Sequence, residues 1–164
     1  MLGPMRRLPI VFVLLATIAC GWAKAAWGRV DPPSQRARTR HTERVQVLAR
    51  KVVTFARHQV GVSYSWGGTS RTTGFDCSGL VYAAYRSIGW KIPRSSWDQL
   101  RVGERIQFAR LRPGDLLFTE GGGHVQLVVS NTAAISAPQT GERVRYVPLA
   151  QLRTEFAGAR RLIR

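Results

Sequence analysis

Cysteine and acidic residues are both scarce in this chain. Its 164 residues include two cysteines, Cys20 and Cys77, and nine aspartates and glutamates. Two cysteines are too few for a disulfide-rich scaffold, and a chain of this length can bury a hydrophobic core without cross-links. Hydrophobic residues make up 45% of the chain and charged residues 21%, which excludes a disordered or fibrous protein. We therefore expect one globular domain with a short additional segment.

The sequence also lacks internal repeats. Its Cys and His residues do not have the spacing of zinc ligands, and we predict no metal and no other cofactor. What it has in excess is basic charge, because 25 Lys and Arg give a formal net charge of +16. Such a chain attracts polyanions, which include nucleic acid, anionic lipid headgroups and acidic cell-wall polymers. The basic residues are scattered, without the aromatic-interleaved run of a nucleic-acid motif, so we expect no nucleic-acid partner.

A long apolar run is found only near the N-terminus. Residues 8–19 form an apolar stretch that is too short for a comfortable membrane span. Arg6 and Arg7 precede this stretch, and residues 23–25 (AKA) have the small-x-small pattern of a cleavage site. Together these features predict a secretory signal peptide over residues 1–25.

Two alternatives to a cleaved signal remain open. The segment could stay attached as an N-terminal anchor, or Cys20 could carry a lipid, although Thr17 stands where a lipobox usually has Leu. Cleavage after Ala25 predicts a secreted, periplasmic or wall-associated protein in which Cys77 is the only cysteine. A single cysteine in that setting is a reactive thiol, an intermolecular bridge, or a buried residue that acts as a small hydrophobe.

The next part of the chain changes from a linker to helices. Residues 26–41 are rich in Arg, Pro and Ser without an apolar period, which predicts a basic flexible linker. Apolar residues at helical spacing predict helices over residues 42–60 and 77–88. Ser95 or Ser96 is expected to cap a short third helix.

The second half of the domain has the pattern of strands. Short β-branched or alternating segments, separated by Gly and Pro, predict strands at residues 115–119, 124–130, 133–136, 143–147 and 159–163. Helices followed by strands predict an α+β domain, with N-terminal helices packed on an antiparallel β-sheet.

Cys77 is placed for chemistry by the helix that it begins. Unpaired backbone N–H groups and the positive end of the helix dipole favour a thiolate in the first helical turn. Asp76 or Ser78 could supply the cap, and the N–H of Cys77 could bind a developing oxyanion. We therefore predict a nucleophilic thiol with a lowered pKa.

A thiol nucleophile needs a base, and the chain has three histidines. His41 lies in the predicted linker, and His58 lies near the end of the first predicted helix, where a surface position is expected. His124 follows three glycines, which let the backbone approach closely, and it opens an apolar strand. A structural histidine is the alternative, but the pattern favours His124 as the general base for Cys77.

Five ordered segments carry a resemblance to a known family: 60–68 (VGVSYSWGG), 75–81 (FDCSGLV), 93–99 (PRSSWDQ), 111–118 (LRPGDLLF) and 123–125 (GHV). With them, the chain resembles the NlpC-type family of papain-like peptidoglycan endopeptidases over about residues 45–164. The resemblance implies a papain-like fold with the nucleophile at a helix N-terminus, and a cysteine peptidase domain over residues 42–164.

The resemblance also implies roles for single residues. Cys77 would attack a peptide carbonyl to form a thioester, while His124 would activate Cys77, protonate the leaving amine and then activate water. Tyr64 would point its hydroxyl into the cleft, unless it is a core aromatic residue. Asp76 and Ser78 would shape the turn around the nucleophile or hold the substrate peptide.

Arg94 is a candidate partner for a substrate carboxylate, because a guanidinium binds a carboxylate through two hydrogen bonds. A structural or surface arginine is the alternative. The family's substrates are peptidoglycan stem peptides, often cut between D-glutamate and a diamino acid. The resemblance thus implies an exported cysteine endopeptidase, acting as a monomer on wall peptides, with its basic charge attracted to the anionic cell envelope.

One position departs from the family pattern. Twelve residues after His124 the family commonly has His, and sometimes Asn, Gln or Glu, to orient the imidazole, whereas this chain has Ser136. Serine can accept a hydrogen bond from the ring but brings no charge. Gln139 is a second candidate for this role, and Gln126 stands where a small Gly is usual. The departure leaves open a catalytically weak or inactive wall-peptide-binding module of the same fold.

Overall fold

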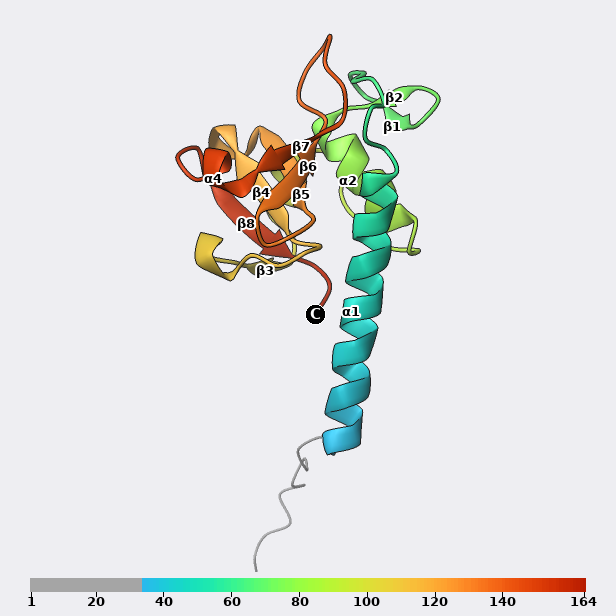
Figure 1. Cartoon of the computed structure of the whole chain (residues 1–164), viewed down its shortest axis with the longest axis vertical. Coiled ribbons are helices and arrows are strands. Elements are labelled where there is room, and N and C mark those ends of the chain that lie inside the picture. The colour runs from blue at the N-terminus through green and yellow to red at the C-terminus, as the bar shows by residue number, and fades with distance from the viewer. Residues whose placement is uncertain (1–33) are drawn as a thin grey trace, which may run out of the picture. The chain divides into compact units, whose positions relative to one another are not determined.

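The computed structural model describes residues 34–164 (Figure 1). The predicted signal peptide and residues 26–33 of the predicted linker lie outside this part of the chain. The helices are α1 (Gln35–Arg57), α2 (Cys77–Arg86), α3 (Ser96–Gln99) and α4 (Leu149–Leu152), with short 3-10 turns η1 (Phe108–Arg110) and η2 (Glu120–Gly122). The strands are β1 (Thr69–Ser70), β2 (Gly74–Phe75), β3 (Glu104–Arg105), β4 (Leu116–Thr119), β5 (His124–Val128), β6 (Ala133–Ser136), β7 (Arg145–Pro148) and β8 (Gly158–Arg161).

Six strands form one sheet in the order β3-β8-β4-β5-β6-β7, and every neighbouring pair is antiparallel. The strands β1 and β2 pair separately, just before α2. Because helices come first and an antiparallel sheet follows, the predicted α+β class is confirmed. The five predicted strands correspond to β4 through β8, and Ser95 caps α3 as expected. No sequence pattern indicated α4, β3 or the β1-β2 pair, whose elements are all two to four residues long.

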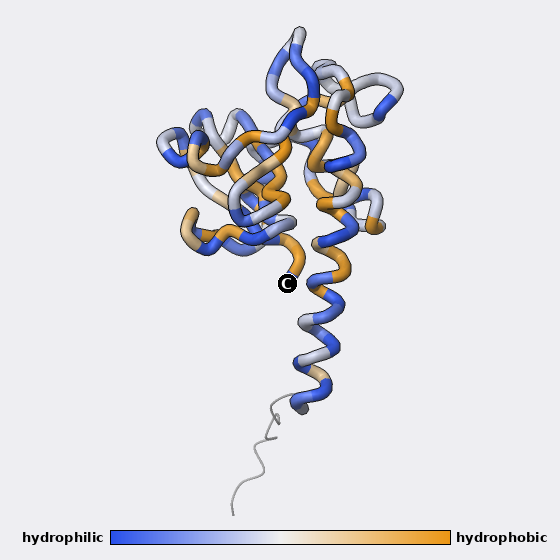
Figure 2. The backbone as a smooth tube through the Cα atoms, in the orientation of Figure 1, coloured by the Kyte–Doolittle hydropathy of each residue, from blue (hydrophilic) through white to orange (hydrophobic). Residues whose placement is uncertain are grey.

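The first helix begins earlier than its apolar pattern predicts. It starts at Gln35, so the prediction of a flexible linker through residue 41 was wrong over residues 35–41. Ser34 caps the helix by accepting a hydrogen bond from the Ala37 N–H, and the Thr39 hydroxyl bonds to the Gln35 carbonyl. Residues 34–44 are all exposed, so they show no apolar period (Figure 2). Hydrophobic periodicity detects the packed half of this helix and misses the exposed half.

The core lies on both faces of the sheet. Along β4, Leu116 and Phe118 point toward the helix layer of α1 and α2, whereas Leu117 packs in a second cluster with Leu149 and Leu152 of α4. This alternation is the period of two that a strand imposes on its side chains. A sheet that is buried on both faces explains why β4 reads as a continuous apolar run.

The hairpin of β4 and β5 fixes where the two candidate catalytic elements meet. Thr119 pairs with His124 at the closed end of this hairpin, and the opposite end begins next to Gly114. The hydroxyl of Tyr85, near the C-terminus of α2, donates a hydrogen bond of 2.7 Å to the Gly114 carbonyl. The C-terminus of α2 is therefore held at the Gly114 end, which sends its N-terminus, Cys77, toward His124. No helix among residues 34–164 is long and apolar enough to cross a membrane.

Candidate active site

Cys77 is the first residue of α2, and Asp76 caps that helix. Asp76 has an extended backbone, and its Oδ1 accepts a hydrogen bond of 2.6 Å from the N–H of Gly79. A Cβ on Gly79 would collide with the carbonyl oxygen of Gly68, so only glycine allows the loop to approach the helix this closely. The cap and the glycine together set the turn that presents the Cys77 thiol.

The Asp76 carboxylate also holds a neighbouring loop and an arginine. Its Oδ2 accepts a hydrogen bond of 2.8 Å from the N–H of Gly67, and the Arg94 guanidinium donates to both oxygens, at 2.9 and 2.6 Å. Burial acts to raise the pKa of this carboxyl, but the bonds from Arg94 and Gly79 outweigh burial. The pKa of Asp76 is therefore below its ordinary value, and the group is ionised at neutral pH.

Arg94 has most of its donors engaged within the chain. Besides Asp76, it donates 2.9 Å to the Ser78 hydroxyl and 3.4 Å to the Gly68 carbonyl. The structure thus gathers the three predicted binding residues, Asp76, Ser78 and Arg94, into one hydrogen-bonded cluster behind the nucleophile. In this arrangement Arg94 pairs with the chain's own carboxylate, which corresponds to the structural alternative for this residue.

Gln99 is a site residue to which sequence reasoning assigned no role. Its side chain is fully buried, and its Nε2 donates to the carbonyl of Ser78 at 3.1 Å and to that of Pro93 at 2.9 Å. It therefore ties α3 and the loop that carries Arg94 to the first turn of α2. The signal in the sequence was the position of Gln99 in the 93–99 motif, but only the fold shows which carbonyls it binds.

The prediction of a lowered pKa for Cys77 was wrong for the resting protein. Burial raises the pKa of the thiol, and the nearby negative charge of Asp76 raises it further. Hydrogen bonds from the backbone N–H groups of Val125 and Ser78 act in the opposite direction but do not outweigh burial. The helix N-terminus does favour a thiolate, but desolvation of the partly buried sulfur outweighs this effect.

His124 is the first residue of β5, the strand that packs against α2. The backbone N–H of the next residue, Val125, acts on the Cys77 sulfur, so the start of β5 lies against the start of α2. The Nε2 of His124 is 2.8 Å from the Ser136 hydroxyl, so Nδ1 is the ring nitrogen that does not take part in this hydrogen bond. Burial lowers the pKa of His124, so the imidazole is neutral at neutral pH.

Ser136 lies at the end of β6, buried, where its hydroxyl meets the imidazole. The second candidate for this position, Gln139, instead donates to Glu142 at 2.9 Å in an exposed turn. Gln126 is buried and donates to the Thr119 hydroxyl at 3.1 Å, across the hairpin. Among residues 34–164, Ser136 is the only residue whose side chain forms a hydrogen bond with His124.

Tyr64 lies on the loop that faces the nucleophile. Burial raises the pKa of its phenol, and the adjacent charges of Cys77 and Asp76 raise it further, while Arg94 lowers it. These interactions place Tyr64 beside the thiol, half-buried, and keep its hydroxyl protonated. By contrast His41 is exposed on α1, and His58 is an exposed C-cap of the same helix.

No group of three or more His, Cys, Asp or Glu side chains in the 34–164 region could hold a metal ion. The polar groups of the site are instead a thiol, an imidazole, three hydroxyls, and a carboxylate paired with a guanidinium. In such a set a thiol can act as a nucleophile and a neutral imidazole as a base.

Comparison with known proteins identifies the family. The sequence profile of the NlpC/P60 family matches residues 61–161. Murein DD-endopeptidase MepH of Escherichia coli is 37% identical over 133 residues, covering 75% of this chain and 49% of the relative. Gamma-D-glutamyl-L-lysine dipeptidyl-peptidase of Bacillus subtilis is 37% identical over 98 residues, covering 56% of this chain and 33% of the relative.

Among solved structures, the P60 domain of the Mycobacterium avium subspecies paratuberculosis antigen MAP1204 superposes with a TM-score of 0.67 at 31% identity, covering 74% of this chain and 98% of that domain. The chain spans half or less of the length of the curated relatives above, but nearly all of a solved P60 domain. On the profile match, the shared fold and the ordered motifs, the chain belongs to the NlpC/P60 family.

Proposed function

We propose that this protein is a cysteine endopeptidase that hydrolyses peptide bonds in the stem peptides of bacterial peptidoglycan. The observation that carries the proposal is that α2, which begins at Cys77, packs against β5, which begins at a neutral His124 hydrogen-bonded to Ser136. The names of two relatives, a murein endopeptidase and a gamma-D-glutamyl-L-lysine peptidase, support a wall peptide as the substrate.

The reaction begins from a neutral thiol and a neutral imidazole. When the substrate carbonyl reaches the sulfur, His124 accepts the thiol proton and the sulfur forms a bond to the carbonyl carbon. The N–H of Cys77 has no hydrogen-bond acceptor among residues 34–164, and together with the Tyr64 hydroxyl it is available for the resulting oxyanion. The C–N bond then breaks, the leaving amine takes the proton from His124, and a thioester remains.

Hydrolysis of the thioester reuses the same base. His124 takes a proton from water, the hydroxide adds to the thioester carbonyl, and the C–S bond breaks to release the carboxylate and restore the thiol. Ser136 orients the ring through Nε2 in both halves of the reaction. Because Ser136 carries no charge, it stabilises the imidazolium less than an anionic partner does, and this favours slow turnover.

The same observation supports a second candidate function. With a neutral orienting group and a buried imidazole of lowered pKa, the site suits a module that holds wall peptides and cuts them weakly or not at all. Both candidates place the peptide beside Cys77, and they differ only in turnover.

The deciding experiment is mass spectrometry of defined muropeptides after incubation with the protein and with Cys77→Ala. We expect cleavage between D-glutamate and the diamino acid by the protein, and no fragments with the variant. Intact muropeptides in both reactions would favour the binding module, and cleavage at another bond would overturn the bond assignment. The acid limb of kcat/KM should lie below pH 6.5, because His124 is a base only above its lowered pKa.

We also propose that the chain is exported and that its basic charge holds it near the anionic envelope. Support comes from the composition of residues 1–25 and from a net charge that stays about +13 without them, since this segment carries three basic residues and no acidic one. N-terminal sequencing of the protein recovered from the envelope should begin at Ala26. A chain that begins at Met1 would instead indicate a retained anchor.

A further inference from the structure

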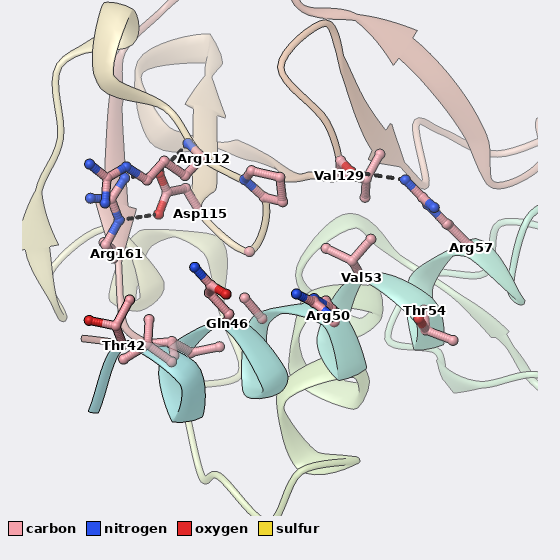
Figure 3. A pocket seen from close by; sticks show the side chains of 15 residues that line it. Thr42, Gln46, Arg50, Val53, Thr54, Arg57, Arg112, Asp115, Val129 and Arg161 are labelled. Atoms are coloured by element: carbon pink, nitrogen blue, oxygen red, sulfur yellow. Dashed lines mark hydrogen bonds and ion pairs between the residues drawn. The ribbon is translucent and has the colours of Figure 1, made fainter. Parts of the chain in front are cut away.

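A groove of about 820 Å³ lies between α1 and the turn that precedes β4 (Figure 3). One wall is formed by α1, from which Gln46 points toward the opposite wall and which also contributes Arg50 to the lining. The opposite wall carries Arg112 and Asp115 of the turn and Arg161 of β8. Apolar side chains, among them Val53, Val129 and Ile163, form the rest of the lining.

The groove is separate from the candidate active site. His124 begins β5 and Val129 follows the end of that strand, so the two are about 16 Å apart along an extended backbone. Asp115 likewise precedes β4, whose other end, Thr119, pairs with His124. The groove therefore lies at the far end of the hairpin, and none of the catalytic candidates lines it.

The charge of the groove is strongly positive. Arg161 pairs with Asp115 through bonds of 2.8 and 2.7 Å, which neutralises the only carboxylate in the lining. Arg57 donates one bond to the Val129 carbonyl at 3.1 Å. The guanidinium groups of Arg50 and Arg112 have no hydrogen-bond acceptor in the part of the chain that the structure describes. Both residues line the groove, so its lining carries an excess of positive charge that an anionic ligand would complement.

The chain itself does not supply that ligand. Residues 1–33 carry four basic residues and a single acidic one, Asp31, and a second copy brings a net charge of +16. A polyphosphate would satisfy the arginines but leave the apolar lining uncovered. An acidic peptide has carboxylates for Arg50 and Arg112 and small side chains for the apolar surface between them.

We propose that this groove binds a second, uncleaved stem peptide of peptidoglycan and so holds the protein on the polymer. The proposal rests on the proposed function for the identity of the acidic peptide. A wall polymer repeats its stem peptides, and one peptide in the groove therefore raises the local concentration of others at the active site.

The test measures binding rather than cleavage, in the Cys77→Ala background. Arg50→Ala/Arg112→Ala removes the two free guanidinium groups, and Arg101→Ala/Arg105→Ala is the matched control, since it removes two exposed arginines that do not line the groove. The ligand is purified peptidoglycan stripped of phosphate-containing polymers. We expect the groove variant to bind about fivefold more weakly and the control to bind within about twofold of the parent.

Two further arms identify the ligand chemistry. Amidation of the peptidoglycan carboxyls should abolish the difference between the groove variant and its parent, and soluble polyphosphate should compete no better with the parent than with the groove variant. Equal weakening in the control variant, or no weakening in the groove variant, would overturn the proposal, as would selective competition by polyphosphate. Failure of the muropeptide digestion alone would remove the proposed catalysis and leave this binding result intact.

Discussion

The hydrogen bonds and the ion pair of the buried Asp76 allow an estimate of how much stability the chain loses when Asp76 is replaced. In Asp76→Ala, α2 loses its N-cap, which costs about 1 kcal/mol. The Gly67 N–H loses its acceptor, which costs about 1 kcal/mol more. Loss of the ion pair adds about 1 kcal/mol to this cost. Breaking a fully buried pair would cost about 3 to 5 kcal/mol, but here only the side chain of Asp76 is buried, at 10% exposed, whereas that of Arg94 is 37% exposed.

The expected loss of unfolding free energy is thus about 3 kcal/mol, which lowers Tm by about 6 to 12 °C for a chain of this size. Urea unfolding followed by circular dichroism measures it directly. Asp76→Asn keeps an oxygen for the Gly79 N–H and should lose about half as much. A double-mutant cycle of Asp76→Ala with Arg94→Ala should show a coupling of about 1 kcal/mol.

The pH dependence follows from the direction of the pKa shift. The pKa of Asp76 is lower in the folded chain than the ordinary 3.8, so its stabilisation is complete above about pH 4 and is lost as pH falls through the folded value. Asp76→Asn should lack this loss of stability in acid. The reasoning is refuted if the two substitutions are additive, or if Arg94→Ala leaves Tm unchanged and raises only KM, because Arg94 would then serve the substrate.

Three other predictions concern the nucleophile, the orienting group and the core. Burial raises the pKa of Cys77 above 9.0, so iodoacetamide should label it more slowly than a free thiol at neutral pH, with a rate that rises only in alkali; rapid labelling near neutrality would indicate a resting ion pair with His124. Ser136→Ala should lower kcat on muropeptides about tenfold and Ser136→His should preserve or raise it, whereas equal rates in all three proteins would exclude Ser136 from catalysis. Tyr85→Phe should cost about 1 to 2 kcal/mol in urea unfolding because it leaves the buried Gly114 carbonyl without its 2.7 Å hydrogen bond, and a smaller loss would mean that water replaces the hydroxyl.

Local sequence patterns predicted the helices and strands whose signal lies within one short segment. The strands β4 to β8 were found from alternation and β-branched residues, and the start of α2 at Cys77 was found from its motif. The start of α1 was missed because residues 35–41 are exposed, and an apolar period exists only where a helix packs. The candidates Cys77, His124 and Ser136 came from motif order and spacing; the structure joins His124 to Ser136 by a hydrogen bond and packs β5 against the helix that begins at Cys77.

The sequence by itself determined the family, the fold class and the residue types of the site, because motifs, periodicity and caps are properties of neighbouring residues. Only the tertiary structure decided the state of the thiol, since desolvation by β5 depends on a strand that begins 47 residues after Cys77. It likewise decided that Arg94 pairs with Asp76, and that Arg50 and Arg112, from distant parts of the chain, line one groove. Burial, charge pairing and grooves arise between segments far apart in the sequence, and so they follow from the fold.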